Sequence, residues 1–190
     1  MTFQDFSILI IFFIIAFSGI IINIVKKGGV SEIIFEQDGR TLLAFRLVVP
    51  AVLVVSVLVY FSFYGHYEKV AQLYYWGYAF VISGLLIRWT AVLSLGDAFT
   101  VKVSILKNQS LKTDGIYSKI RHPSYTGLLL YYFGLGLIMQ NSICLCLLTI
   151  APLWVVLHRI KQEEIVLNNH FGGTYKSYSF KTWKLLPYVY

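Results

Sequence analysis

The sequence predicts an all-α membrane protein with about five transmembrane helices, the last two forming a tight helical hairpin. Of the 190 residues, 57% are hydrophobic. Charged residues make up only 13% of the chain, whereas about a quarter is typical of soluble domains. Several uncharged stretches are long enough to cross a bilayer as a helix, which takes roughly 20 residues. The length corresponds to one domain, so residues 1–190 are expected to form a single integral membrane unit.

Five apolar stretches follow one another along the chain. They span 6–25, 47–64, 70–95, 124–139 and 142–157. Only Arg88 interrupts the third stretch, and only Gln140 and Asn141 separate the fourth from the fifth, which predicts two antiparallel neighbouring helices. In the first stretch the positive charges, Lys26 and Lys27, follow the apolar run and no small-residue cleavage pattern is present. We therefore expect this stretch to be a retained helix and not a signal peptide.

The distribution of positive charge predicts the orientation in the membrane. Three clusters hold nearly all the basic residues: Lys26, Lys27, Arg40 and Arg46; Lys102, Lys107, Lys112, Lys119 and Arg121; Arg159, Lys161, Lys176, Lys181 and Lys184. With five spans all three clusters fall on one side, which the positive-inside rule makes the cytoplasmic side. The N-terminus is then outside, and the C-terminal tail is cytoplasmic. Because orientation accounts for the net charge of +7, no nucleic-acid partner is expected.

The chain divides into a scaffold of three helices, 1–95, and a working half, 96–190. The working half begins with a 29-residue connection, "LGDAFTVKVSILKNQSLKTDGIYSKIRHP". A loop of this length is uncommon unless it has a function. The alternation of Val101, Val103 and Ile105 suggests an ordered loop lying on the membrane face.

Polar residues gather at the start of the fourth apolar stretch. Pro123 suits the first turn of a helix, where its missing N–H costs nothing. His122 and Arg121 then lie just outside the helix, beside its unpaired N–H groups and positive dipole end, an arrangement suited to binding an anion. The alternative for Arg121 is that it only anchors the helix at the lipid headgroups.

A second polar cluster follows the fifth stretch. Arg159 and Glu163 are four residues apart and share one helix face, with Glu164 beside them. Because the fourth and fifth stretches form a hairpin, this cluster and His122 should converge. The alternative is an ordinary surface ion pair of small energetic value. Arg88, inside the third stretch, either snorkels to the membrane surface or lines a polar cavity facing the same place.

These residues carry a resemblance to a known family. The patterns G-x-Y-x-x-x-R-H-P-x-Y, R-x-x-x-E-E and F-G-x-x-Y-x-x-Y occur in that order, followed by "KLLP", within about residues 88–187. Together they resemble the isoprenylcysteine carboxyl methyltransferases, integral membrane enzymes that use S-adenosyl-L-methionine. The first two apolar stretches match only as generic hydrophobic helices. Asn168, Asn169 and Gly173 stand where the family often has acidic residues.

The resemblance implies a fold, a reaction and a set of site residues. It implies a cofactor-binding loop on the cytoplasmic side and methyl transfer from S-adenosylmethionine to the carboxylate of an isoprenylcysteine-like acceptor. Arg159 is implied as the catalytic residue that holds this carboxylate, with Arg88 as a second substrate-binding residue. The implied cofactor-binding residues are Gln109, Ser110, Leu111, Lys112, Tyr117, His122, Pro123, Ser124, Tyr125 and Glu163.

The chemistry of the residues agrees with a carboxylate acceptor. A carboxylate is already ionised at neutral pH and needs no general base, and the planar guanidinium of Arg159 suits its orientation. An amine or thiol acceptor would need a proton acceptor, for which Glu164 and His158 are the local candidates. The lipophilic or prenylated substrate would enter from the bilayer, among membrane lipids, and the cofactor from the cytoplasm. The histidines His66, His158 and His170 lack ligand spacing, so no metal is expected.

Three alternatives remain open at this point. The same fold could methylate a phospholipid amine, a small thiol or another lipid-like acceptor. Membrane sterol and steroid reductases, which use NADPH, resemble the same "RHPSY" stretch, although the R-x-x-x-E-E pattern is not expected in them. A structural membrane protein without activity would bind no cofactor at all.

Overall fold

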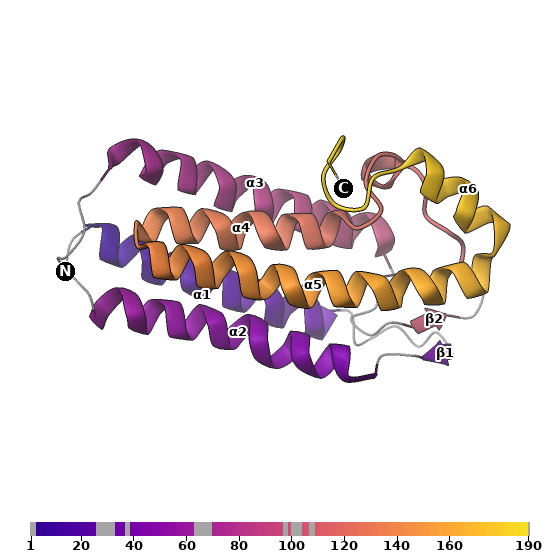
Figure 1. Cartoon of the computed structure of the whole chain (residues 1–190), viewed down its shortest axis with the longest axis horizontal. Helices are drawn as coiled ribbons and strands as arrows, with labels where there is room; N and C mark the ends of the chain where they lie inside the picture. Colours follow the sequence, from indigo (N-terminus) through magenta and orange to yellow (C-terminus); the bar gives the residue numbers. More distant parts are fainter. Residues whose placement is uncertain are drawn as a thin grey trace.

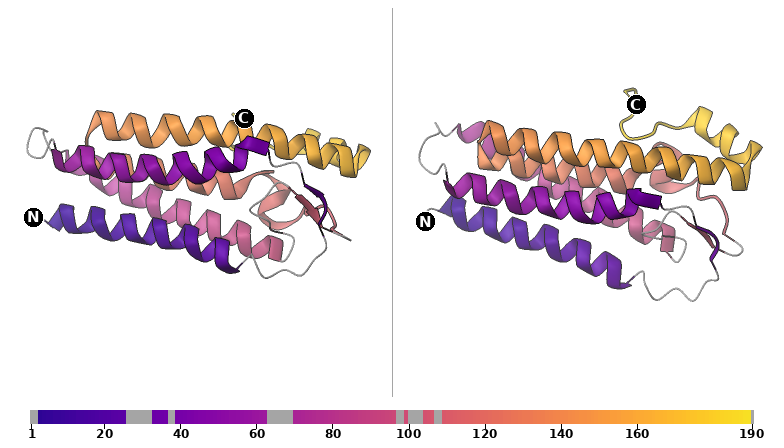
Figure 2. Two further views of the ribbon diagram at one scale, coloured as in Figure 1. Left: turned by 90° about the horizontal axis from the view of Figure 1, so that it is seen from below. Right: turned by 60° about the horizontal axis from the view of Figure 1, so that its bottom comes forward.

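A computed structural model describes residues 3–25, 33–36, 39–62, 70–96, 99, 104–106 and 109–189. Five long helices run alternately up and down in one bundle (Figure 1). They are α1 (Phe3–Val25), α2 (Gly39–Ser62), α3 (Ala71–Leu95), α4 (Pro123–Met139) and α5 (Ser142–Phe171), and a short helix, α6 (Gly173–Lys181), follows. The hairpin between α4 and α5 lies at the same end as the N-terminus, whereas α6 lies at the opposite end (Figures 1 and 2).

The predicted class, an all-α membrane protein with about five spans, is confirmed. Helices α1, α2, α3 and α5 are each long and apolar enough to cross a membrane. Helix α4 has 17 residues and contacts α1, α3 and α5, so it lies inside the bundle. Helix α5 continues well past the predicted end of its apolar stretch, because Arg159, Ile160 and Val166 bury one face of the extension.

The predicted connection of α4 and α5 has clear local causes. Gln140 ends α4 in the left-handed region, at φ 51°, and its side chain exchanges hydrogen bonds with the backbone of Val70 at 2.8 and 3.0 Å. The side chain of Asn141 caps α5 by accepting from the N–H groups of Ile143 and Cys144. These two polar residues therefore both reverse the chain and satisfy the exposed helix ends.

A small antiparallel sheet was not predicted. Strand β1 (Ile33–Glu36) pairs with β2 (Ser104–Leu106), with Phe35 opposite Ile105 and Glu36 opposite Ser104. The sheet lies at the end of the bundle that carries α6 (Figure 1). Of the three alternating residues in the long connection, Ile105 lies in β2, whereas Val101 and Val103 lie outside the described residues.

Two pairs of glycines bring α3 and α4 into close contact. A Cβ atom added at Gly127 would lie 2.5 Å from the carbonyl oxygen of Gly84, and one added at Gly134 would lie 2.6 Å from that of Gly77. On each helix the two glycines are seven residues apart, so the contacts repeat along one face. Small residues are the usual means of close helix packing in membranes. This contact places Arg88 of α3 beside the start of α4.

Candidate active site

One cavity of about 430 Å³ opens at the end of the bundle that carries α6. Every site residue predicted from the sequence lines it: Arg88, Gln109, Ser110, Leu111, Lys112, Tyr117, His122, Pro123, Ser124, Tyr125, Arg159 and Glu163. The cavity also has an apolar part between α1 and α2, whose lining includes Phe12, Ile15, Ile20, Val49, Leu53 and Val54. A polar region and an apolar region thus share one cavity.

The turn before α4 is held in place by the C-terminal tail. His122 is the N-cap of α4 and Pro123 occupies the first turn, as predicted. The N–H of Arg121 donates to the carbonyl of Trp183 at 2.8 Å, and the N–H of His122 donates to that of Lys184 at 3.1 Å. The tail therefore forms a short parallel β-bridge with this turn, and it fixes where the His122 side chain lies.

Arg121 serves this tail contact. Its Nε lies 3.0 Å from Oε1 of Glu164, and its Nη1 donates to the carbonyl oxygens of Ser179, at 2.7 Å, and Thr182. With a side-chain exposure of 8%, Arg121 is not a surface anchor. The structure gives it a role in joining α4, α5 and the tail.

His122 lies between the two adjacent glutamates of α5. Its Nδ1 is 3.7 Å from Glu163 and its Nε2 is 3.5 Å from Glu164, and the imidazole side chain is only 2% exposed. Glu164 is further paired with Lys184 at 3.0 Å and is absent from the cavity lining, whereas Glu163 lines the cavity. Neighbouring residues on a helix point in different directions, so the two carboxylates have different surroundings.

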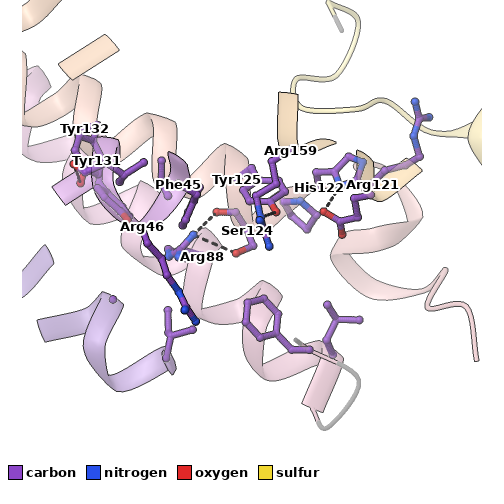
Figure 3. A pocket seen from close by; sticks show the side chains of 18 of the residues that line it. Phe45, Arg46, Arg88, Arg121, His122, Ser124, Tyr125, Tyr131, Tyr132 and Arg159 are labelled. Atoms are coloured by element: carbon purple, nitrogen blue, oxygen red, sulfur yellow. Dashed lines mark hydrogen bonds and ion pairs between the residues drawn. The ribbon is translucent and has the colours of Figure 1, made fainter. Parts of the chain in front are cut away.

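Tyr125 contacts Arg159 at the cavity wall (Figure 3). Nε of Arg159 donates to the Tyr125 hydroxyl at 2.9 Å, and Glu163 lines the same cavity. The Arg159 guanidinium also lies over the ring of Phe45, 5.4 Å from its centroid, and the residue is 3% exposed. The predicted convergence of Arg159, Glu163 and the start of α4 is therefore present in the structure.

Arg88 faces the same cavity from α3. Its Nη1 donates to the carbonyl and the hydroxyl oxygen of Ser124 at 3.0 and 3.2 Å. Arg88 is 7% exposed, and its Nε has no hydrogen-bond partner among the described atoms. Of the two possibilities left by the sequence, snorkelling or lining a cavity, the structure has the second.

Tyr117 closes the cavity from the loop before α4. Its hydroxyl donates to the carbonyl of Ala91 at 3.2 Å, and its own carbonyl accepts from Tyr178 at 2.7 Å. Burial, together with the nearby charge of Glu163, raises the pKa of Tyr117 above its usual value. Burial also raises the pKa of Tyr178 to about 12. Both side chains are therefore neutral phenols, and hence donors, at physiological pH.

Tyr175, Tyr178, Phe45 and Arg46 are among the lining residues that were not predicted as site residues. Tyr175 and Tyr178 lie on α6, and the buried hydroxyl of Tyr175 has no hydrogen-bond partner among the described atoms. These two tyrosines are the Tyr positions of the F-G-x-x-Y-x-x-Y pattern, and their spacing of three on a helix could have placed them on one face. Phe45 and Arg46 come from α2, where the apolar sequence offered no comparable signal.

Comparison with known proteins supports the resemblance seen in the sequence. The model of the isoprenylcysteine carboxyl methyltransferase family matches residues 77–169. Protein-S-isoprenylcysteine O-methyltransferase B of Arabidopsis thaliana is 29% identical over 143 residues, which cover 72% of each chain. Over these residues the chain is similar to the isoprenylcysteine carboxyl methyltransferases. The prediction made from the three motifs is thereby confirmed.

Two further relatives extend beyond the matched region. The enzyme of Xenopus laevis is 32% identical over 130 residues, which cover 67% of this chain and 45% of the Xenopus protein. The solved structure of the eukaryotic intramembrane Ras methyltransferase superposes with a TM-score of 0.66 at 28% identity, over 73% of this chain and 52% of that one. The chain thus spans about half the length of these two relatives. Helices α1 and α2 lie outside the residues that the family model matches.

Proposed function

We propose that this protein is an isoprenylcysteine carboxyl methyltransferase, which transfers a methyl group from S-adenosylmethionine to the carboxylate of an isoprenylcysteine-like lipid. The observation that carries the proposal is the cavity of about 430 Å³. Its polar part holds Arg159, Tyr125 and Glu163, and its apolar part lies between α1 and α2. A water-soluble donor and a lipid acceptor need these two environments within one space.

The residues of the polar part suit S-adenosylmethionine. Glu163 offers a partly exposed carboxylate to an ammonium group or to ribose hydroxyls. The neutral phenol of Tyr117 would pack beside the cofactor. The buried hydroxyl of Tyr175, which has no hydrogen-bond partner among the described atoms, supplies a further polar atom at the cavity wall. The cofactor would be held by Gln109–Lys112, Tyr117, His122–Tyr125 and Glu163. When bound, it supplies the methyl group, whose bond to sulfur breaks as a bond to the acceptor oxygen forms, with the electron pair left on sulfur.

The acceptor carboxylate would be held by Arg159. The contacts with Tyr125 and Phe45 fix this guanidinium, so little side-chain entropy would be lost when it binds. A carboxylate gives up no proton during methyl transfer. An amine or thiol acceptor would have to lose a proton, and the candidate bases are Glu164 and His158. Neither of them lines the cavity, and Glu164 is already paired with Arg121 and Lys184. Arg88 would be a second contact for the acceptor.

We further propose how the two substrates reach the cavity. The prenyl chain would enter from the bilayer into the apolar part lined by α1 and α2. The cofactor would enter from the cytoplasm, because the basic clusters near the cavity end favour a cytoplasmic position for it and an N-terminus outside.

The acceptor can be tested directly with the purified protein in detergent. Labelled S-adenosylmethionine is offered with N-acetyl-S-farnesylcysteine, with its carboxamide, with phosphatidylethanolamine and with a small aliphatic thiol. We expect the label to be transferred only to the carboxylic acid. The labelled product should be a methyl ester, which alkali hydrolyses. Label on the amine or the thiol would overturn the carboxylate assignment, and no label on any acceptor would overturn the proposed activity.

A further inference from the structure

Arg88 is a buried cation whose hydrogen bonding is incomplete. It is 7% exposed, and its Nη1 donates to two oxygen atoms of Ser124. Nε has no hydrogen-bond partner among the described atoms. Burying a guanidinium without a counter-ion is costly, and cations inside membrane helices commonly mark a substrate path. The wall of the cavity around Arg88 is therefore suited to an anion.

Arg46 adds a second guanidinium to the same cavity from α2. It lies seven residues after Gly39, the first residue of α2, roughly 10 Å along the helix axis. No described carboxylate forms an ion pair with Arg46 or Arg88. In Figure 3 both arginines lie on the Tyr131 side of Tyr125, whereas His122 and Arg121 lie on the other side. The two cations are thus separate from the cluster that contains the glutamates.

We propose that Arg46 and Arg88 form a carboxylate-binding subsite on the membrane side of Arg159, and that Arg46 determines specificity for an ionised lipid acceptor. The inference rests on the proposed function. An acceptor moving along the apolar part between α1 and α2 meets this pair before it reaches Arg159. Methylation removes the negative charge of the acceptor, so the ester product loses its attraction to both guanidinium groups. The subsite therefore favours binding of the acid over retention of the ester.

Arg46 is the residue to change, because its side chain is exposed and forms no hydrogen bond among the described contacts. Replacing it therefore removes no described contact that holds the bundle together. The variants are Arg46→Gln and Arg46→Lys. Lys176→Gln is the matched control, since Lys176 is exposed on α6 outside the cavity lining and loses the same charge. Binding of N-acetyl-S-farnesylcysteine and of its methyl ester is measured by calorimetry in detergent. We expect Arg46→Gln to weaken binding of the acid about tenfold or more, as for loss of a charged hydrogen bond, and to leave binding of the ester unchanged.

The conservative variant Arg46→Lys and the kinetic constants distinguish a role of Arg46 in binding the acceptor from a purely structural role. Arg46→Lys should retain most of the preference for the acid, and Lys176→Gln should retain all of it. In methyl transfer, Arg46→Gln should raise KM with little change in kcat. Equal weakening of acid and ester, or an unchanged preference in Arg46→Gln, would overturn the inference while the activity stands. A parent protein that binds neither compound would overturn both the inference and the proposed function.

Discussion

Two adjacent and chemically identical residues, Glu163 and Glu164, have different surroundings in this protein. Glu163 faces the cavity, whereas Glu164 faces Arg121, His122 and Lys184 at the tail. The R-x-x-x-E-E pattern placed both near the site, and helix geometry required them to diverge. The four-residue spacing from Arg159 and the family resemblance pointed to Glu163 as the glutamate at the site, whereas the contacts of Glu164 with the tail were revealed by no local pattern.

Glu163→Gln tests the cavity-facing carboxylate. The amide keeps the size of the side chain but removes the charge that would hold an ammonium group or accept from ribose hydroxyls. We expect the affinity for S-adenosylmethionine to fall about tenfold or more, with an unchanged unfolding temperature. Calorimetry on the variant and a thermal melt check this outcome. Unchanged affinity would show that Glu163 is not a cofactor ligand.

Glu164→Gln should have the reverse profile. The change leaves Arg121 and Lys184 without their shared anion, and Arg121 is almost fully buried. Losing one partner of such a group costs about 2–3 kcal/mol, below the range for fully buried pairs because Glu164 is 18% exposed. We expect a clearly lower unfolding temperature, with cofactor affinity retained in the folded fraction. A variant as stable as the parent would contradict the role of Glu164 in holding the tail.

Arg159→Ala tests the acceptor assignment at the residue scale. Because Arg159 contacts Tyr125 and Phe45 and would meet the acceptor but not the cofactor, cofactor binding should persist within a few-fold. Transfer to N-acetyl-S-farnesylcysteine should fall by roughly a hundredfold or more, the effect of losing a preorganised charged contact in the transition state. Calorimetry and single-turnover measurements give the two numbers. Full turnover by this variant would argue against a carboxylate held by Arg159.

At the scale of elements, the hydrophobic pattern predicts the helices, whereas contacts between distant segments of the chain determine how they are joined and packed. The apolar stretches predicted the five long helices, and Gln140 and Asn141 predicted the hairpin, because these signals are local. The β1–β2 pairing and the bridge between the tail and the turn before α4 join segments far apart in sequence, so no local pattern specifies them. The glycines Gly77, Gly84, Gly127 and Gly134 were visible as two seven-residue spacings, but their pairing requires knowing that α3 and α4 are in contact.

Gly127→Ala tests the α3–α4 contact. The added Cβ would meet the Gly84 carbonyl at 2.5 Å and the Arg88 amide nitrogen at 2.6 Å, so the two helices must separate. We expect a loss of about 1–3 kcal/mol in stability, and reduced methyl transfer because Arg88 moves away from Ser124. Gly173→Ala is the control, since an added Cβ there has nothing within 4 Å. Equal melting temperatures for both variants would contradict close packing at Gly127.

At the scale of the whole molecule, the site depends on segments that the sequence places far apart. Five site residues come together because α3 and α5 run toward the end of the bundle at which α4 begins. They are Arg88, Tyr117, His122, Arg159 and Glu163. That convergence followed from the number of spans and the hairpin, so the sequence predicted these five residues of the cavity but not Tyr175 and Tyr178 of α6. The contribution of α2, including Phe45 and Arg46, could not be predicted because uniformly apolar helices carry little information about which face meets which neighbour.

The central claim is that one cavity holds both the methyl donor and the lipid acceptor. An experimental structure of the protein with S-adenosylhomocysteine and N-acetyl-S-farnesylcysteine tests it most directly. We predict the nucleoside product beside Tyr117 and Glu163, the carboxylate at Arg159, and the prenyl chain between α1 and α2. Ligands bound in two separate places, or a prenyl chain outside the space between α1 and α2, would contradict the account.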